Sequence, residues 1–189
     1  MSAGIALGDV EFRTSATVRF SPVKKVKLYL TPELRFKEQR LDKILAGAEI
    51  KVSPLKVLDL GLGYKAVINY TNDGSSELIH RIEVYSQAKH KIARFSPAVR
   101  IMYVNYDEDE GVSHFLRYKA KVDYNIRKSK LDPYIATELY HQLTGNILYK
   151  MRYSIGIDWR FAKKNSIGLA YKLDDYVGDT RVKHVFDLG

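Results

Sequence analysis

Five histidines are the side chains of this 189-residue sequence that are best suited to acid–base chemistry. Ser113 and Glu110 flank His114, and a serine, a histidine and a carboxylate together could hydrolyse an ester. Ser113 and His114 are adjacent, however, and adjacent residues of a strand point to opposite faces. Four histidines fall on the apolar face of expected strands, near one end: His80, His114, His141 and His184. An amphipathic ring there also suits a membrane interface, so we expect no catalytic residues, with a hydrolase as an alternative.

Two further patterns are candidates for ion or phosphate binding. The run "DEDE" at 107–110 offers carboxylate oxygens, which divalent cations prefer, but it lacks the spaced ligands and the fixed glycine of a calcium loop. The glycines of "LGLGYK" alternate on one face of a strand instead of opening a helix, so they do not form a phosphate loop. Cysteine is absent, which excludes thiolate sites. We therefore expect no metal ion and no cofactor.

The composition is that of a single folded domain rich in strands, covering residues 1–189. Hydrophobic residues make up 46% and charged residues 28%, which excludes a disordered chain. The 14 tyrosines favour strands, because aromatic side chains suit a pleated surface. No run reaches the roughly 18 consecutive apolar residues of a membrane helix. The formal charge of +9 raises nucleic acid as a partner, so the location of the charges must decide.

Apolar and polar residues alternate along most of the chain. From Leu58 to Tyr70 every second residue is apolar or aromatic, and the intervening face carries residues such as Asp59 and Lys65. A strand segregates residues with a period of two, whereas a helix does not. This test predicts about eleven strands, most of them about a dozen residues long, at 9–21, 25–37, 42–52, 56–70, 77–89, 93–106, 113–127, 132–144, 147–162, 165–176 and 181–189.

The connections between these strands alternate in character. Short basic turns occur in "FSPVKKVKL", "KVSPLKVL", "KHKIARF", "IRKSKLD" and "FAKKNSIG". The intervening connections are longer and more acidic or polar: "KEQRLD", "NYTNDGSSE", "NYDEDEGVS", "HQLTGN" and "DDYVGDT". Short turns at one end and longer loops at the other are typical of an up-and-down antiparallel transmembrane β-barrel, here with about 10–12 strands.

The apolar face is expected to point outward, toward lipid. A tilted strand of about 10–13 residues spans an apolar band of about 25 Å. Bulky aromatics gather near both ends of the strands, as in the interfacial girdles of membrane barrels. The expected girdle residues are Phe20, Phe95, Tyr124, Trp159 and Phe161 toward the basic turns, and Phe36, Tyr70, Tyr103 and Tyr149 toward the polar loops. The expected lipid-facing residues are Leu58, Leu60, Leu62, Val122, Ile155 and Ile157. A soluble, lipocalin-like barrel with an apolar ligand inside is the alternative.

Three segments resemble a family of uncharacterised outer-membrane β-barrels of Gram-negative bacteria: "LYLTPELRF", "DPYIATELYHQL" and "YKMRYSIGIDWRFAKKNSIGLAYKLDD". The resemblance covers most of the chain, is diffuse and contains no invariant chemical motif. It implies an exported porin-like barrel in contact with outer-membrane lipid, and it assigns no role.

The polar face then lines a lumen with an excess of positive charge. By alternation, about 22 Lys/Arg and 11 Asp/Glu fall on this face. The basic residues expected to line the lumen are Arg117, Lys119, Lys121, Lys150, Arg152 and Arg160. Cations inside a barrel do not form a surface that tracks nucleic acid. We predict a non-enzymatic structural barrel or a narrow anion-biased pore for a small anionic solute. A lipid-modifying hydrolase of the outer membrane is the alternative.

The two ends of the sequence depart from a full-length barrel of this family. Residues 1–8 lack the features of a signal peptide, and the chain stops at "HVFDLG" within a strand-like alternation. Eleven strands would also place the first and last strands parallel, whereas bacterial single-chain barrels have even numbers. We therefore expect a strand count that is wrong by one, or a strand that is missing from this chain. The last strand is also expected to be truncated.

Overall fold

Twelve strands form the regular structure of the residues that the structure describes. It is a computed structural model and describes residues 9–71, 74–108, 111–162 and 165–189. The strands are β1 (Asp9–Ser15), β2 (Val18–Val23), β3 (Val26–Lys37), β4 (Arg40–Leu55), β5 (Leu58–Tyr70), β6 (Ser76–Lys89), β7 (Phe95–Glu108), β8 (Gly111–Tyr124), β9 (Leu131–Gln142), β10 (Ile147–Arg160), β11 (Ser166–Tyr176) and β12 (Val182–Leu188). Across these described ranges, no helix has the length and apolar character to cross a membrane.

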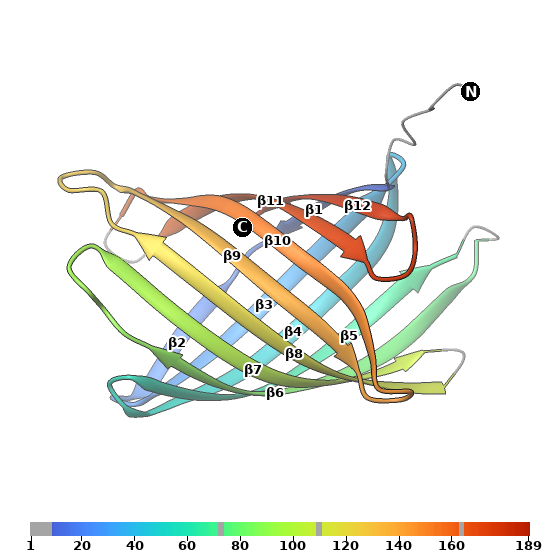
Figure 1. Cartoon of the computed structure of the whole chain (residues 1–189), viewed down its shortest axis with the longest axis horizontal. Coiled ribbons are helices and arrows are strands. Elements are labelled where there is room, and N and C mark those ends of the chain that lie inside the picture. The colour runs from blue at the N-terminus through green and yellow to red at the C-terminus, as the bar shows by residue number, and fades with distance from the viewer. Residues whose placement is uncertain (1–8, 72–73, 109–110, 163–164) are drawn as a thin grey trace.

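The strands form one closed up-and-down barrel (Figure 1), and their pairing gives eleven spans. Strands β2 to β11 each pair antiparallel with the next strand along the chain. β1 and β2 lie along the same edge of β3 and are separated by residues 16–17, so they count as one span. The prediction of an antiparallel barrel with about eleven long strands is therefore confirmed.

The barrel closes through a parallel pair. β1 pairs with β12 in parallel, from Asp9 opposite Lys183 to Thr14 opposite Leu188. The odd count is thus a property of the structure and not an error of one strand, which corrects the expectation from even-numbered barrels. Within the described residues β2 has a strand partner only on its β3 side.

The two ends of the barrel differ in charge more than in loop length. We call the end with connections 24–25, 56–57, 90–94, 125–130 and 161–165 the basic end, and the opposite one the polar end. The strand bounds leave two to six residues between spans at the basic end and two to five at the polar end. The expected contrast between short turns and long loops is therefore wrong. Strands extend into the polar segments; for example, "KEQRLD" contracts to a turn at Glu38 and Gln39, both with positive φ.

Alternation places the apolar face outside. Leu62 on β5 is 52% exposed and Ile155 on β10 is 59% exposed, whereas Asp59 on the other face of β5 is only 1% exposed. A large exposed apolar surface on every side of a closed barrel is suited to hydrocarbon and not to water. The soluble alternative requires these side chains to converge inside, so it does not fit the structure.

The interior is packed on the side of β4–β7. Leu45, Val67 and Ile79 form one buried apolar cluster, and Tyr85 packs with Met102 and Val104 in another.

Two glycines allow tyrosine rings to lie against the inner wall. A Cβ atom at Gly61 would lie 2.1 Å from Cε1 of Tyr85, and one at Gly156 would lie 2.5 Å from Cζ of Tyr134. The glycines of the polar face therefore permit a close approach of ring to backbone, as expected for a crowded lumen.

Candidate functional site

A cavity of about 430 Å³ lies inside the barrel toward the polar end. Side chains from every strand except β2 line it. Of the described residues that line it, eleven are basic and four are acidic. The basic ones are Arg13, Arg35, Lys43, Lys65, Arg81, Arg117, Lys119, Lys150, Arg152, Lys172 and Lys183; the acidic ones are Glu11, Glu33, Glu138 and Asp174. The cavity is therefore strongly electropositive.

One cross-strand row alternates cations with carboxylates. The register places Lys119 opposite Glu138, Glu138 opposite Arg152, and Arg152 opposite Asp174. Asp174 is in turn opposite Lys183 on β12. Directly opposed residues on one sheet face have Cβ atoms about 5 Å apart, so unlike charges in register attract one another. The row begins and ends with a lysine and so carries a net positive charge.

Three of the buried carboxylates, Asp174, Glu83 and Glu11, are each shared between two cations. Asp174 accepts hydrogen bonds from Nε and Nη2 of Arg152 at 2.5 and 2.6 Å, and from Nζ of Lys150 at 2.9 Å. Asp174 itself is 1% exposed. A carboxylate that accepts several charged donors compensates for its loss of hydration. One negative charge nevertheless neutralises only one of the two cations.

The same sharing occurs at two other acids. Glu83 lies 3.2 Å from Nζ of Lys65 and 2.6 Å from Nη2 of Arg81. Glu11 forms ion pairs with Arg13 and Lys183. Around the lumen, the sharing of Asp174, Glu83 and Glu11 leaves a surplus of cations although these acids are paired.

A second row, nearer the polar end, alternates cations with tyrosines. Arg117 is opposite Tyr140, Tyr140 is opposite Lys150, and Lys150 is opposite Tyr176. The guanidinium of Arg117 lies 4.6 Å from the Tyr140 ring centroid, and Nζ of Lys150 lies 4.5 Å from it. Cations over ring faces are attracted by the ring quadrupole. The rings hold the cations in place without neutralising their charge.

Lys43 and Lys119 are the cations most available to a solute. Within the described part of the chain the structure gives neither of them an ion pair or a hydrogen bond, yet both line the cavity. A partly buried ammonium group without a protein partner must be solvated by water or bind an anion. These two lysines therefore mark where a small anion would be held.

A protein-family model with the description "Protein of unknown function (DUF2490)" matches residues 12–174, which is most of the chain. This chain belongs to the DUF2490 family. The expectation of an uncharacterised barrel family is thereby confirmed. No curated protein matches the sequence. A solved structure described as "KdgM porin" is similar with a TM-score of 0.50 and 11% sequence identity, over 88% of this chain and 90% of that one. At this identity the likeness supports the barrel fold alone.

Four of the six basic residues predicted for the lumen line the cavity of this DUF2490 barrel: Arg117, Lys119, Lys150 and Arg152. Lys121 lies nearer the basic end, where it pairs with Asp123 and its Nζ lies 4.0 Å from the Tyr134 ring centroid. Arg160 is near the rim of the basic end, half exposed and paired with Asp132. The prediction named basic residues of β8 and β10 only, whereas the cavity also takes basic residues from seven other strands: β1, β3, β4, β5, β6, β11 and β12.

The interior aromatics of the DUF2490 barrel were missed as site residues. Tyr106, Phe115 and Tyr149 form a chain of ring contacts, with centroids 5.4 Å and 5.5 Å apart. Tyr149 was predicted for the outer girdle, yet it lines the cavity beside Lys150. A register shift between Leu148 and Lys150 breaks the alternation there, so the side chains of Tyr149 and Lys150 both reach the inside.

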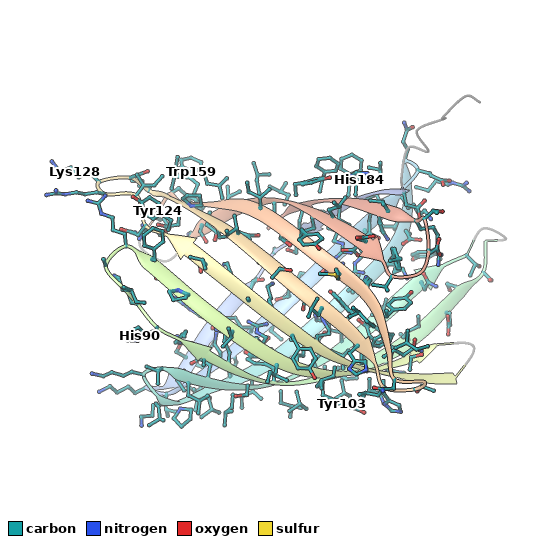
Figure 2. The ribbon with its side chains drawn as sticks, in the orientation of Figure 1. His90, Tyr103, Tyr124, Lys128, Trp159 and His184 are labelled. Carbon is teal, nitrogen blue, oxygen red and sulfur yellow. The ribbon has the colours of Figure 1, made fainter. Side chains whose placement is uncertain are left out.

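The other predicted girdle residues of the DUF2490 barrel lie on its outer face or at its rim. Figure 2 shows Tyr124 and Trp159 at the end that carries His90 and Lys128, which is the basic end, and Tyr103 nearer the polar end. Phe20, Phe95 and Trp159 are all about half exposed or more. Their placement is compatible with two interfacial rows; contact with lipid stays a prediction.

Four of the five histidines of the DUF2490 barrel form hydrogen bonds with neutral partners. Nδ1 of His80, His114 and His184 each hydrogen bonds to a tyrosine hydroxyl, and Nε2 of His141 hydrogen bonds to Oδ1 of Asn146. Glu110, which a hydrolytic triad would require beside His114, lies outside the described residues, as does part of the "DEDE" run. Within the described ranges, no group of three or more His, Asp or Glu side chains is arranged to hold a metal ion.

Proposed function

We propose that this protein is a bacterial outer-membrane β-barrel that acts as a narrow pore selective for small anions. The observation that carries the proposal is that eleven basic residues and only four acidic residues line one interior cavity. A pore whose wall carries a surplus of fixed cations favours anions, as rings of Arg and Lys do in anion channels. The exposed apolar face and the aromatics near both ends of the strands support a membrane location.

A second cavity lies at the basic end of the barrel. The second cavity has a volume of about 580 Å³ and is lined by Tyr134, Asp158 and Asp187, among others. Lys172 lines the first cavity and forms an ion pair with Asp187, which lines the second. The ring of Tyr134 packs over Gly156, in the same cross-strand row as Asp187. We infer that this ion pair and this ring set the narrowest part of the pathway, which makes the conductance small.

Planar-bilayer recording under a salt gradient tests the proposal. The purified barrel should open a small conductance whose reversal potential indicates anion preference. A cation preference would contradict the anion selectivity. A barrel that inserts into the bilayer but conducts no ions would contradict the pore and leave a structural barrel.

The double variant Lys43→Glu/Lys119→Glu should abolish or reverse the anion preference. Each substitution replaces an unpaired cation of the wall by an anion, so the wall loses four units of positive charge with no ion pair broken. The control is Lys56→Glu/Lys128→Glu, which makes the same change in charge at exposed turns of the basic end. It should leave the reversal potential close to that of the wild type. Equal shifts in both variants would show that overall charge, and not the cavity wall, determines selectivity.

A further inference from the structure

Three tyrosine–histidine pairs of like geometry lie on the outer face of the barrel. Tyr64 pairs with His80, Tyr103 with His114, and Tyr171 with His184, with Oη–Nδ1 distances of 2.6, 2.8 and 2.7 Å. In each pair the ring centroids are 6.0 Å apart. In each pair the histidine is on the adjacent strand, two residues closer to the polar end than the residue directly opposite the tyrosine. Figure 2 shows Tyr103 and His184 on opposite sides of the barrel.

The pairing fixes which imidazole nitrogen is available to a ligand. When the phenol donates its proton to Nδ1, the neutral imidazole carries its own proton on Nε2. Within the described chain Nε2 of His184 has no hydrogen-bond partner, and the side chain is partly exposed. Nε2 of His184 is therefore the ring nitrogen left for a ligand on the outer surface, near the polar end of β12, and it is a donor when the Tyr171 hydroxyl donates to Nδ1.

The pair at His184 borders an apolar groove, because its tyrosine, Tyr171, lines that groove. The groove has a volume of about 510 Å³ and crosses the outer face of β8–β11. Its outward-facing lining follows two cross-strand rows: Ala120, Thr137, Tyr153 and Leu173 in one, and Val122, Ile135, Ile155 and Tyr171 in the other.

The two rows continue onto β12, the first at the polar side chain of His184 and the second at the aromatic side chain of Phe186. Leu173 is opposite His184, and Tyr171 is opposite Phe186. Small side chains at Ala120 and Thr137 form the floor of the groove, and the larger rings of Tyr153 and Tyr171 stand beside it. The groove thus joins an apolar channel to a hydrogen-bond donor.

We propose that this groove and His184 together bind one membrane lipid with a phosphate headgroup, an inference that rests on the proposed membrane location. An acyl chain would fill the groove and bury apolar surface against Val122, Ile135 and Ile155, instead of leaving a void beside Tyr153. Phosphate oxygens are strong acceptors for the Nε2–H donor of His184. The Tyr171 hydroxyl holds that imidazole in position.

Native mass spectrometry of the barrel in a nonionic detergent tests this site, with added phosphatidylglycerol and with diacylglycerol of the same chains. The wild type should retain one phosphatidylglycerol and bind diacylglycerol more weakly. His184→Phe should weaken phosphatidylglycerol binding about tenfold, the effect of one lost hydrogen bond to a charged group, and should not change diacylglycerol binding. Ala120→Phe, which fills the groove, should weaken both.

The chain supplies matched controls. His114→Phe removes a histidine from a pair that does not border the groove, and Ala48→Phe adds a ring to the outer face of β4; neither should change lipid retention. Equal retention in wild type, His184→Phe and Ala120→Phe, or an equal loss with His114→Phe, would overturn the site. Insertion of each variant into vesicles is measured in parallel. A barrel that inserts without retaining a lipid overturns only this site, whereas one that does not insert overturns the proposed function.

Discussion

Replacing Leu62 by arginine is expected to destabilise the folded barrel in a bilayer by about 2–4 kcal/mol, the cost of a basic side chain near the midplane of a lipid-facing barrel wall. Leu62 is the fifth of thirteen residues of β5 and is 52% exposed on the outer face. Its neighbours across the sheet are Ile50 and Val84, so no carboxylate is in register to pair with the guanidinium. Urea unfolding of the protein from lipid vesicles measures the change.

Tyr70→Arg is the matched control. Tyr70 is on the same face of the same strand but is its last residue, at the polar end. At the interface the cost of arginine falls to about 0–1 kcal/mol. The difference between the two variants therefore reports depth in the bilayer and not the chemistry of arginine. Equal effects at the two positions would contradict a lipid-facing β5.

Asp174→Asn is expected to destabilise the barrel by roughly 3 kcal/mol, because it leaves Lys150 and Arg152 buried without their shared counter-charge. The asparagine can accept only part of the hydrogen bonds that the carboxylate now accepts from these two side chains. Unfolding in urea, followed by the fluorescence of Trp159 and by electrophoretic mobility, measures the loss.

Asp179→Asn controls for the chemistry of the substitution. Asp179 also pairs with an arginine, Arg181, but this pair is exposed in the connection between β11 and β12. Exposed ion pairs contribute little, so this variant should unfold like the wild type. If added chloride or phosphate restores the stability of Asp174→Asn, the two cations bind the added anion. No change in the stability of Asp174→Asn would mean that Asp174 does not hold the interior together.

The architecture followed from the sequence because side chains of a strand alternate with a fixed period. The faces of β5 and β8, and of β10 beyond Tyr149, could be assigned residue by residue, and the outward direction of Leu62 and Ile155 agrees with that assignment. The count of eleven strands implied a parallel closure, but the even numbers of bacterial barrels argued against it. The pairing of β1 with β12, between residues more than 170 positions apart, decides for the odd count. A one-residue irregularity was equally invisible, and it moved Tyr149 from the expected outer girdle into the cavity.

The composition of the candidate site was predicted better than its arrangement. A basic lumen followed from counting charges on one face. The sharing of Asp174 by two cations, and the alternation of Arg117, Tyr140 and Lys150 along a row, depend on strand register. Register is set by hydrogen bonds between strands, and the sequence of one strand does not reveal which residue of the next lies opposite. The tyrosine–histidine pairs were hidden for the same reason.

Fluorescence quenching of Trp159 by lipid tests most directly the central claim, that the apolar face of the barrel contacts a membrane. Trp159 is the single tryptophan of the chain, is 48% exposed on the outer face of β10, and lies near the basic end. After reconstitution, phospholipids brominated along an acyl chain near the headgroup should quench its emission strongly. Lipids brominated near the chain terminus should quench less, and aqueous iodide should have little effect. Efficient quenching by iodide with none by either brominated lipid would show that the apolar face does not meet lipid, and would contradict the account.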